Sequence, residues 1–80
     1  MSKPARADHA AATTADEAVQ LRLARYGDTE QRELLRANPN LTVATLTWIV
    51  ANWTFSPHHA SEFRAHPNMT PTLARRIRSW

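Results

Sequence analysis

Apolar residues recur at helical spacing along this chain, and no segment alternates between apolar and polar residues over a useful length. The strongest pattern follows Thr42, where five apolar positions would share one broad helical face: Val43, Leu46, Ile49, Val50 and Trp53. Weaker stripes lie on both sides of it. The pattern predicts an all-α fold of about five short helices in a compact helical-repeat-like array, either solenoid or orthogonal, without strands.

The N-terminal part begins without such a pattern. Residues 1–14 are mostly alanine and small polar residues, which favours a disordered tail. Thr14 followed by Glu17 matches a capping box, and the helix after it would place three apolar residues on one stripe: Val19, Leu23 and Tyr26. Gly27, the only glycine, stands where a helix often takes a left-handed C-cap residue.

Caps and prolines mark the later helices. Asp28, with Gln31 three residues on, predicts the start of the second helix, and Thr42 predicts the start of the third. Ser56 and Thr70 each precede a proline, the usual order of an N-cap and a first helical residue, so they would begin the fourth and fifth helices. The fifth helix would turn three apolar residues inward: Leu73, Ile77 and Trp80.

A seven-residue segment occurs twice. Arg-Ala-Asn-Pro-Asn-Leu-Thr at 36–42 returns 28 residues later as Arg-Ala-His-Pro-Asn-Met-Thr at 64–70. In both copies proline stops one helix, asparagine occupies the turn and threonine caps the next helix. We therefore divide the folded part, 15–80, into two repeat-like units, 28–53 and 56–80.

This turn resembles that of the bacterial leucine-rich repeat variant, whose units carry an Asn-Pro-Asn turn between short helices. The resemblance covers roughly 28–80 and depends on the two copies of the turn, the first followed by Leu46. The family's repeat is shorter and usually comes in longer arrays. The resemblance implies a helical-repeat interaction scaffold. The iron–sulfur cluster of one family member has no counterpart here, because this chain lacks cysteine.

Composition narrows the function classes. The chain has 80 residues, ten basic and seven acidic, for a net charge of +3; nine of the ten basic residues are arginine, which with the many alanines is typical of a GC-rich bacterial or phage genome. Without cysteine no disulfide can form. No secretory signal pattern and no run of about 20 apolar residues is present. We expect a cytoplasmic protein without membrane contacts or cofactors.

No residue pattern indicates catalysis or metal binding. His58 and His59 are neighbours on a predicted helix, so their side chains would point about 100° apart, and no carboxylate partner is expected one turn away. His66 adds no third ligand at a useful spacing. Ser61 lacks an orienting acid and an oxyanion turn. Glu33 and its neighbouring arginines indicate a salt-linked solvent face. We expect no enzyme, no metal site and no small-molecule substrate.

Two surfaces remain as candidates for binding. Trp48 lies opposite the apolar face of the third helix, so it is either buried on that second side or an exposed hot spot for a protein partner or self-association. From Asn38 onward there is one acidic residue, Glu62, against four arginines: Arg64, Arg75, Arg76 and Arg78. Three of them fall on the predicted fifth helix, which with the fourth would resemble a helix-turn-helix.

We interpret the chain as a small non-enzymatic adaptor that binds a protein partner through a helical-repeat surface, with Trp48 as the candidate interface residue. The alternative is a nucleic-acid-binding regulator that uses the four C-terminal arginines. The repeated turn argues against the alternative, because the same turn also precedes the third helix, which carries no charge.

Overall fold

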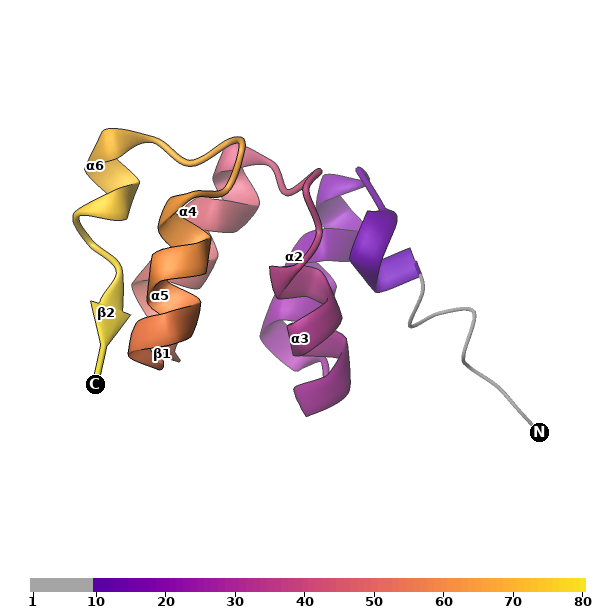
Figure 1. The fold of residues 1–80 in the computed structure, drawn as a ribbon. Coiled ribbons are helices and arrows are strands. Elements are labelled where there is room, and N and C mark those ends of the chain that lie inside the picture. Colours follow the sequence, from indigo (N-terminus) through magenta and orange to yellow (C-terminus); the bar gives the residue numbers. More distant parts are fainter. Residues whose placement is uncertain (1–9) are drawn as a thin grey trace.

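The computed structural model describes residues 10–80 (Figure 1). After a helical turn at 10–13 come four longer helices: α2 (Glu17–Tyr26), α3 (Thr29–Arg36), α4 (Val43–Asn52) and α5 (Pro57–Arg64). The remaining elements are short: β1 (Thr54–Phe55), α6 (Pro71–Ala74) and β2 (Arg78–Ser79). None of the helices within 10–80 combines the length and the apolar character needed to cross a bilayer.

Local caps begin the helices from α3 onward. Asp28 starts α3 with a complete capping box, in which its carboxylate accepts from the backbone N–H of Gln31 and its own N–H donates to the Gln31 side chain. Thr42, Ser56 and Thr70 each accept an N–H three residues on, at the starts of α4, α5 and α6. These caps satisfy donors that have no partner inside the helix. The four predicted helix starts are confirmed.

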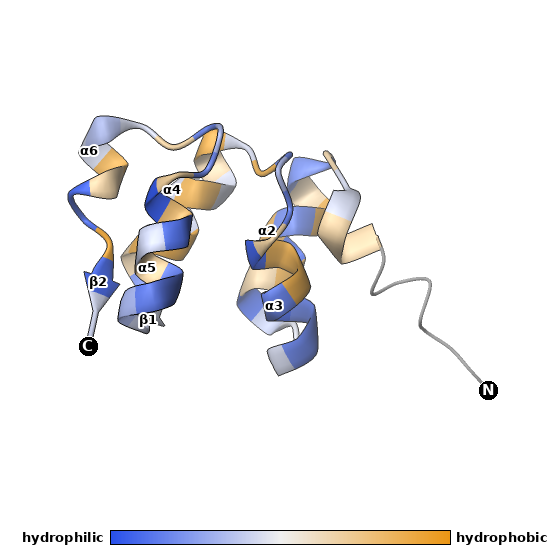
Figure 2. Cartoon of the chain, in the orientation of Figure 1, coloured by the Kyte–Doolittle hydropathy of each residue, from blue (hydrophilic) through white to orange (hydrophobic). Residues whose placement is uncertain are grey.

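The central helix of the core is α4. Leu46 and Ile49 are fully buried and Val50 nearly so, and the hydrophobic residues of α4 stand out in Figure 2. The predicted apolar face is confirmed in its middle and fails at its ends. Val43 is 51% exposed, and Trp53 lies just after the last helical residue.

A buried amide connects α2 to the first proline turn and to α4. Gln20 is fully buried. Its Nε2 donates to the carbonyl oxygens of Thr14 (2.8 Å) and Asn40 (2.9 Å). Its Oε1 accepts from the N–H of Thr42 (3.1 Å) and from the hydroxyl of Thr45 (2.8 Å). Both donors and both acceptor positions of the amide are used, so its burial leaves no polar group unsatisfied.

The predicted tail is too long. Residues 10–13 are helical, and Ala11 is fully buried. The side-chain amide of Asn38 donates to the carbonyl oxygens of Ala11 (3.2 Å) and Thr14 (2.8 Å). The alanine-rich sequence has no apolar stripe that would predict packing. It is nevertheless held against the first proline turn, because Ala11 is buried and the carbonyl oxygens of Ala11 and Thr14 accept hydrogen bonds from Asn38. The part of the prediction that concerns residues 1–9 lies outside the described residues.

Two predicted caps of α2 are wrong. Asp16 rather than Thr14 is the N-cap, because its carboxylate accepts from two N–H groups of the first turn. Gly27 has φ −68° and ψ 156°, an extended rather than a left-handed conformation. Glycine suits this position for another reason. A Cβ here would lie 2.5 Å from the carbonyl oxygen of Leu23.

The predicted long fifth helix and the predicted absence of strands are also wrong. Helix α6 ends at Ala74, and β2 then pairs in parallel with β1. The N–H of Trp80 donates to the carbonyl oxygen of Phe55 (3.1 Å) and continues this pairing. Ile77 becomes buried as expected, but Trp80 is 74% exposed and does not face inward.

Candidate functional site

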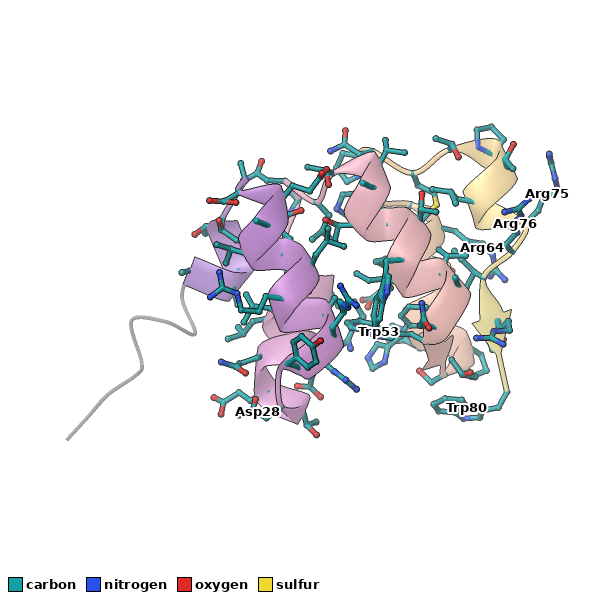
Figure 3. The ribbon with its side chains drawn as sticks, turned by 180° about the vertical axis from the view of Figure 1, so that it is seen from behind. Asp28, Trp53, Arg64, Arg75, Arg76 and Trp80 are labelled. Atoms are coloured by element: carbon teal, nitrogen blue, oxygen red, sulfur yellow. The ribbon has the colours of Figure 1, made fainter. Side chains whose placement is uncertain are left out.

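An open cavity of about 400 Å³ lies beside α3. Its walls come from three parts of the chain: one face of α3, the segment 52–56 together with His59 of α5, and Trp80. Figure 3 shows Trp53 between the ribbons of α3 and α5, with Trp80 farther toward the end of the chain. Segments distant in the sequence therefore build this site, which we call the α3 cavity.

The α3 wall is a single helical stripe. Thr29, Arg32, Glu33 and Arg36 line the cavity, and their spacing of three and four residues places them on one face of the helix. Leu35 turns to the other side and is fully buried in the core. The capping box at the start of α3 sets where the helix begins, and with it which residues face the cavity.

The two arginines of this wall have no carboxylate partner among residues 10–80. In that part of the chain the one carboxylate within ion-pair distance of a basic side chain is Glu62, whose oxygen lies 3.3 Å from Nε2 of His58 on the exposed face of α5. Arg32 instead donates to the carbonyl oxygen of Arg25 at 3.5 Å, a long hydrogen bond. Glu33 lies on the same stripe without coming within ion-pair distance of either arginine. The predicted salt-linked face of α3 is wrong.

Arg36 contacts α5. Its Nη2 lies 3.3 Å from Nε2 of His59, and both side chains are half-buried. A guanidinium group can only donate, so Nε2 of His59 is the acceptor in this contact. The other N–H groups of Arg36 have no acceptor within the described chain and can bind a ligand.

Aromatic residues also line the cavity, together with Asn52, Thr54 and Ser56. The guanidinium carbon of Arg32 lies 5.7 Å from the ring centroid of Trp53, a cation–π geometry. The indole Nε1 of Trp53 is buried and has no hydrogen-bond partner among residues 10–80. A buried donor of this kind costs about 1–3 kcal/mol. The cavity wall thus combines two cations and two indole rings.

The four arginines singled out in the sequence lie at the C-terminal end instead. Arg64 is in the last turn of α5, Arg75 and Arg76 follow α6, and Arg78 is in β2; all four are exposed. Figure 3 shows Arg64, Arg75 and Arg76 near one edge of the molecule. Arg76 and Arg78 line a second cavity of about 250 Å³, and Arg78 also donates to the carbonyl oxygen of Ala51 (2.9 Å).

This placement corrects the helix-turn-helix interpretation. The predicted second helix is α6, which has four residues and carries none of the arginines. Arg75 is its C-cap, and the chain then turns toward β2. Arg75, Arg76 and Arg78 therefore lie on a turn and a short strand, and Arg64 alone of the four belongs to a helix, at the end of α5.

Trp48 is half-buried and packs against the hydrophobic core. It lines neither cavity. The position agrees in part with each of the two interpretations made from the sequence, because one portion of the indole is covered and another reaches solvent.

The histidines do not meet as a group. Within 10–80 no set of three possible metal-ligating side chains comes together. His58 does have a carboxylate neighbour one helical turn on, Glu62, which the sequence analysis overlooked. His59 faces the α3 cavity, and His66 contacts the carbonyl oxygen of Asn38 at 2.8 Å. His58, His59 and His66 therefore have different environments.

Sequence reasoning missed the α3 cavity. The polar stripe on α3 was readable from its spacing, but it was interpreted as solvated. Trp53 and Trp80 were assigned to inward-facing stripes because both follow the helical period. No local signal could have shown that Trp80, after a strand, lies at the same opening as a helix that starts at Thr29.

Comparisons with known protein families, with curated proteins and with solved structures find no match to this chain.

Proposed function

We propose that this chain is a small non-enzymatic adaptor that binds a protein partner, and that the partner docks at the α3 cavity. The supporting observation is the make-up of the cavity walls, with two tryptophans and two arginines that lack carboxylate partners within 10–80. Tryptophan and arginine are the residues that most often dominate the binding energy at protein interfaces. An opening of about 400 Å³ accommodates a few side chains of a partner.

Hydrogen bonds between turns support a helical-repeat scaffold that resembles the bacterial leucine-rich repeat variant. Asn40 donates through its side-chain amide to the carbonyl oxygen of Thr13 (2.8 Å), and Asn68 donates likewise to that of Leu41 (2.9 Å). Each bond reaches back 27 residues. In our proposal the Pro-Asn turn recurs because its asparagine attaches the second unit to the first, and the first unit to the N-terminal turn, as units of a solenoid attach to their neighbours.

An affinity capture with a matched pair of variants tests the adaptor function. The immobilised chain is incubated with bacterial lysate, with and without nuclease treatment, and a protein partner should remain bound after nuclease. Trp80→Ala should weaken capture by about tenfold or more, as loss of a hot-spot residue does. Tyr26→Ala is the control, since Tyr26 is equally exposed (76%) and does not line the cavity. Equal capture by both variants would move the interface elsewhere, with Trp48 the next residue to test.

A second candidate function is nucleic-acid binding at the C-terminal arginines. The observation that favours it is four exposed guanidinium groups without a carboxylate partner in the described chain. Each phosphate neutralised on duplex DNA adds about −0.9 to the slope of log affinity against log salt. Duplex binding that persists at about 0.15 M salt and is lost on the double change Arg75→Glu and Arg76→Glu would favour this function. Binding that disappears at that salt leaves the adaptor proposal in place.

A further inference from the structure

We infer that the α3 cavity recognises an acidic segment of its partner, in which a carboxylate binds between Arg32 and Arg36 and a neighbouring apolar side chain packs on Trp53 and Trp80. This inference rests on the proposed adaptor function and adds the chemistry of the partner.

The charges on the α3 wall support a carboxylate as the ligand. Arg32 and Arg36 are one helical turn apart on the same face, so their like charges repel. No carboxylate among residues 10–80 lies within ion-pair distance of either group. The imidazole of His59, which contacts Arg36, offers no negative charge to either guanidinium group. A carboxylate in the cavity would relieve the repulsion, and the planar guanidinium fork matches its two oxygens.

The two tryptophan rings of the cavity support an apolar side chain next to that carboxylate. A free inorganic anion would leave the faces of Trp53 and Trp80 uncovered, whereas a peptide can offer a carboxylate and an apolar side chain together. The Arg32 guanidinium now lies over the Trp53 ring. Trp80 lines the same cavity and is 74% exposed, so an apolar side chain of the peptide can pack on its ring.

The negative charge of Glu33 provides a test of whether the ligand is acidic. Glu33 is the one acidic side chain among the described residues of the cavity wall, so it repels an acidic ligand. Removing its charge by Glu33→Gln should therefore strengthen binding of an acidic peptide and leave a purely apolar ligand unaffected. Few surface changes are expected to improve binding, so a gain here is diagnostic.

The test measures fluorescence anisotropy of three labelled peptides with the full chain at low salt. One peptide alternates glutamate with phenylalanine, and the others replace glutamate by glutamine or by lysine. The glutamate peptide should bind at least about tenfold more tightly than either of the others, the discrimination expected for charge-assisted hydrogen bonds. The double change Arg32→Gln and Arg36→Gln should remove that advantage, and Glu33→Gln should increase affinity about twofold or more.

The control pair is Arg75→Gln with Arg76→Gln, which removes the same charge outside the α3 cavity. It should change peptide affinity less than about twofold. Equal losses from both pairs would show long-range attraction without a site and would overturn the inference. Because Arg36 contacts His59, the single change Arg32→Gln provides a variant at an exposed side chain, whose contacts are one long hydrogen bond and the cation–π contact with Trp53. It should weaken the glutamate peptide on its own, and no change would also overturn the inference.

Two further outcomes separate this inference from the adaptor function. If inorganic phosphate or duplex DNA displaces the glutamate peptide from wild type and binds more tightly, the cavity is an oxyanion or nucleic-acid site and the acidic-peptide inference is wrong. If the Arg32→Gln, Arg36→Gln variant still captures the nuclease-resistant partner, the partner is recognised by other chemistry, and the adaptor function stands without the inference.

Discussion

The side-chain amide of Asn38 lies 2.8 Å from the carbonyl oxygen of Thr14, although 24 residues separate them. A second bond from the same amide reaches Ala11, and the Oδ1 of Asn38 accepts the N–H of Asn40 at 2.7 Å. The residue is fully buried. One side chain thus holds the N-terminal turn against the first proline turn and also shapes that turn, so its effect on stability should exceed that of a single hydrogen bond.

Replacing Asn38 by alanine should lower the free energy of unfolding by about 2–4 kcal/mol, because the carbonyl of Ala11 loses its side-chain donor, that of Thr14 keeps only the one from Gln20, and a small cavity forms. Urea denaturation followed by circular dichroism measures it. Asn52→Ala is the matched control, since Asn52 is exposed and bonds only within its own helix, to the carbonyl of Trp48. Similar costs for the two variants would show that the bonds to the N-terminal turn contribute little.

Deleting residues 1–14 should lower the melting temperature clearly more than deleting residues 1–9. The longer deletion removes buried Ala11 and the carbonyl acceptors of Asn38, Asn40 and Gln20. Unpaired buried amides cost about 1–3 kcal/mol each, which is large for a chain of 80 residues. Identical melting curves for the two truncated chains would contradict this.

Gly27→Ala should destabilise the protein by about 1–3 kcal/mol, the usual cost of a steric insertion. Changes of glycine to alanine at unstrained positions commonly stabilise by about 0.4–1 kcal/mol, so the expected sign is the opposite of that trend. The reason is the 2.5 Å approach of the new Cβ to the carbonyl oxygen of Leu23, which itself accepts the N–H of Gly27. A stabilised variant in thermal melts would show that the backbone shifts freely here.

Replacing Trp48 or Leu46 by alanine tests which sides of α4 are buried in the core. Leu46→Ala should cost about 2–5 kcal/mol because Leu46 is fully buried. Trp48→Ala should cost less than this, since Trp48 is half-buried. Sedimentation and partner capture with the Trp48 variant then show whether its accessible part serves an interface. A loss of stability equal to that of Leu46→Ala would assign Trp48 to the core alone.

Local signals in the sequence determined most of the helices. Asp28, Thr42 and Ser56 begin helices where their capping pattern predicts, since an N-cap needs only N–H groups within three residues of itself. The prolines at 39 and 67 stop α3 and α5 for an equally local steric reason. The buried face of α4 was predictable from the helical period of its apolar residues, because a helix with one broad apolar face is stable in water only when that face packs against the rest of the chain.

Tertiary structure alone decided the two ends of the chain and the α3 cavity. Residues 75–80 continue a helical pattern, yet β2 forms because it gains backbone hydrogen bonds to β1 while Ile77 remains buried. The alanine-rich turn at 10–13 is held by Asn38, which lies beyond two intervening helices. In each case the contact that decides the structure is made with a residue more than 20 positions away, where neither periodicity nor capping carries information. For the same reason, the sequence near Arg32, Trp53 and Trp80 does not predict that these residues line one cavity.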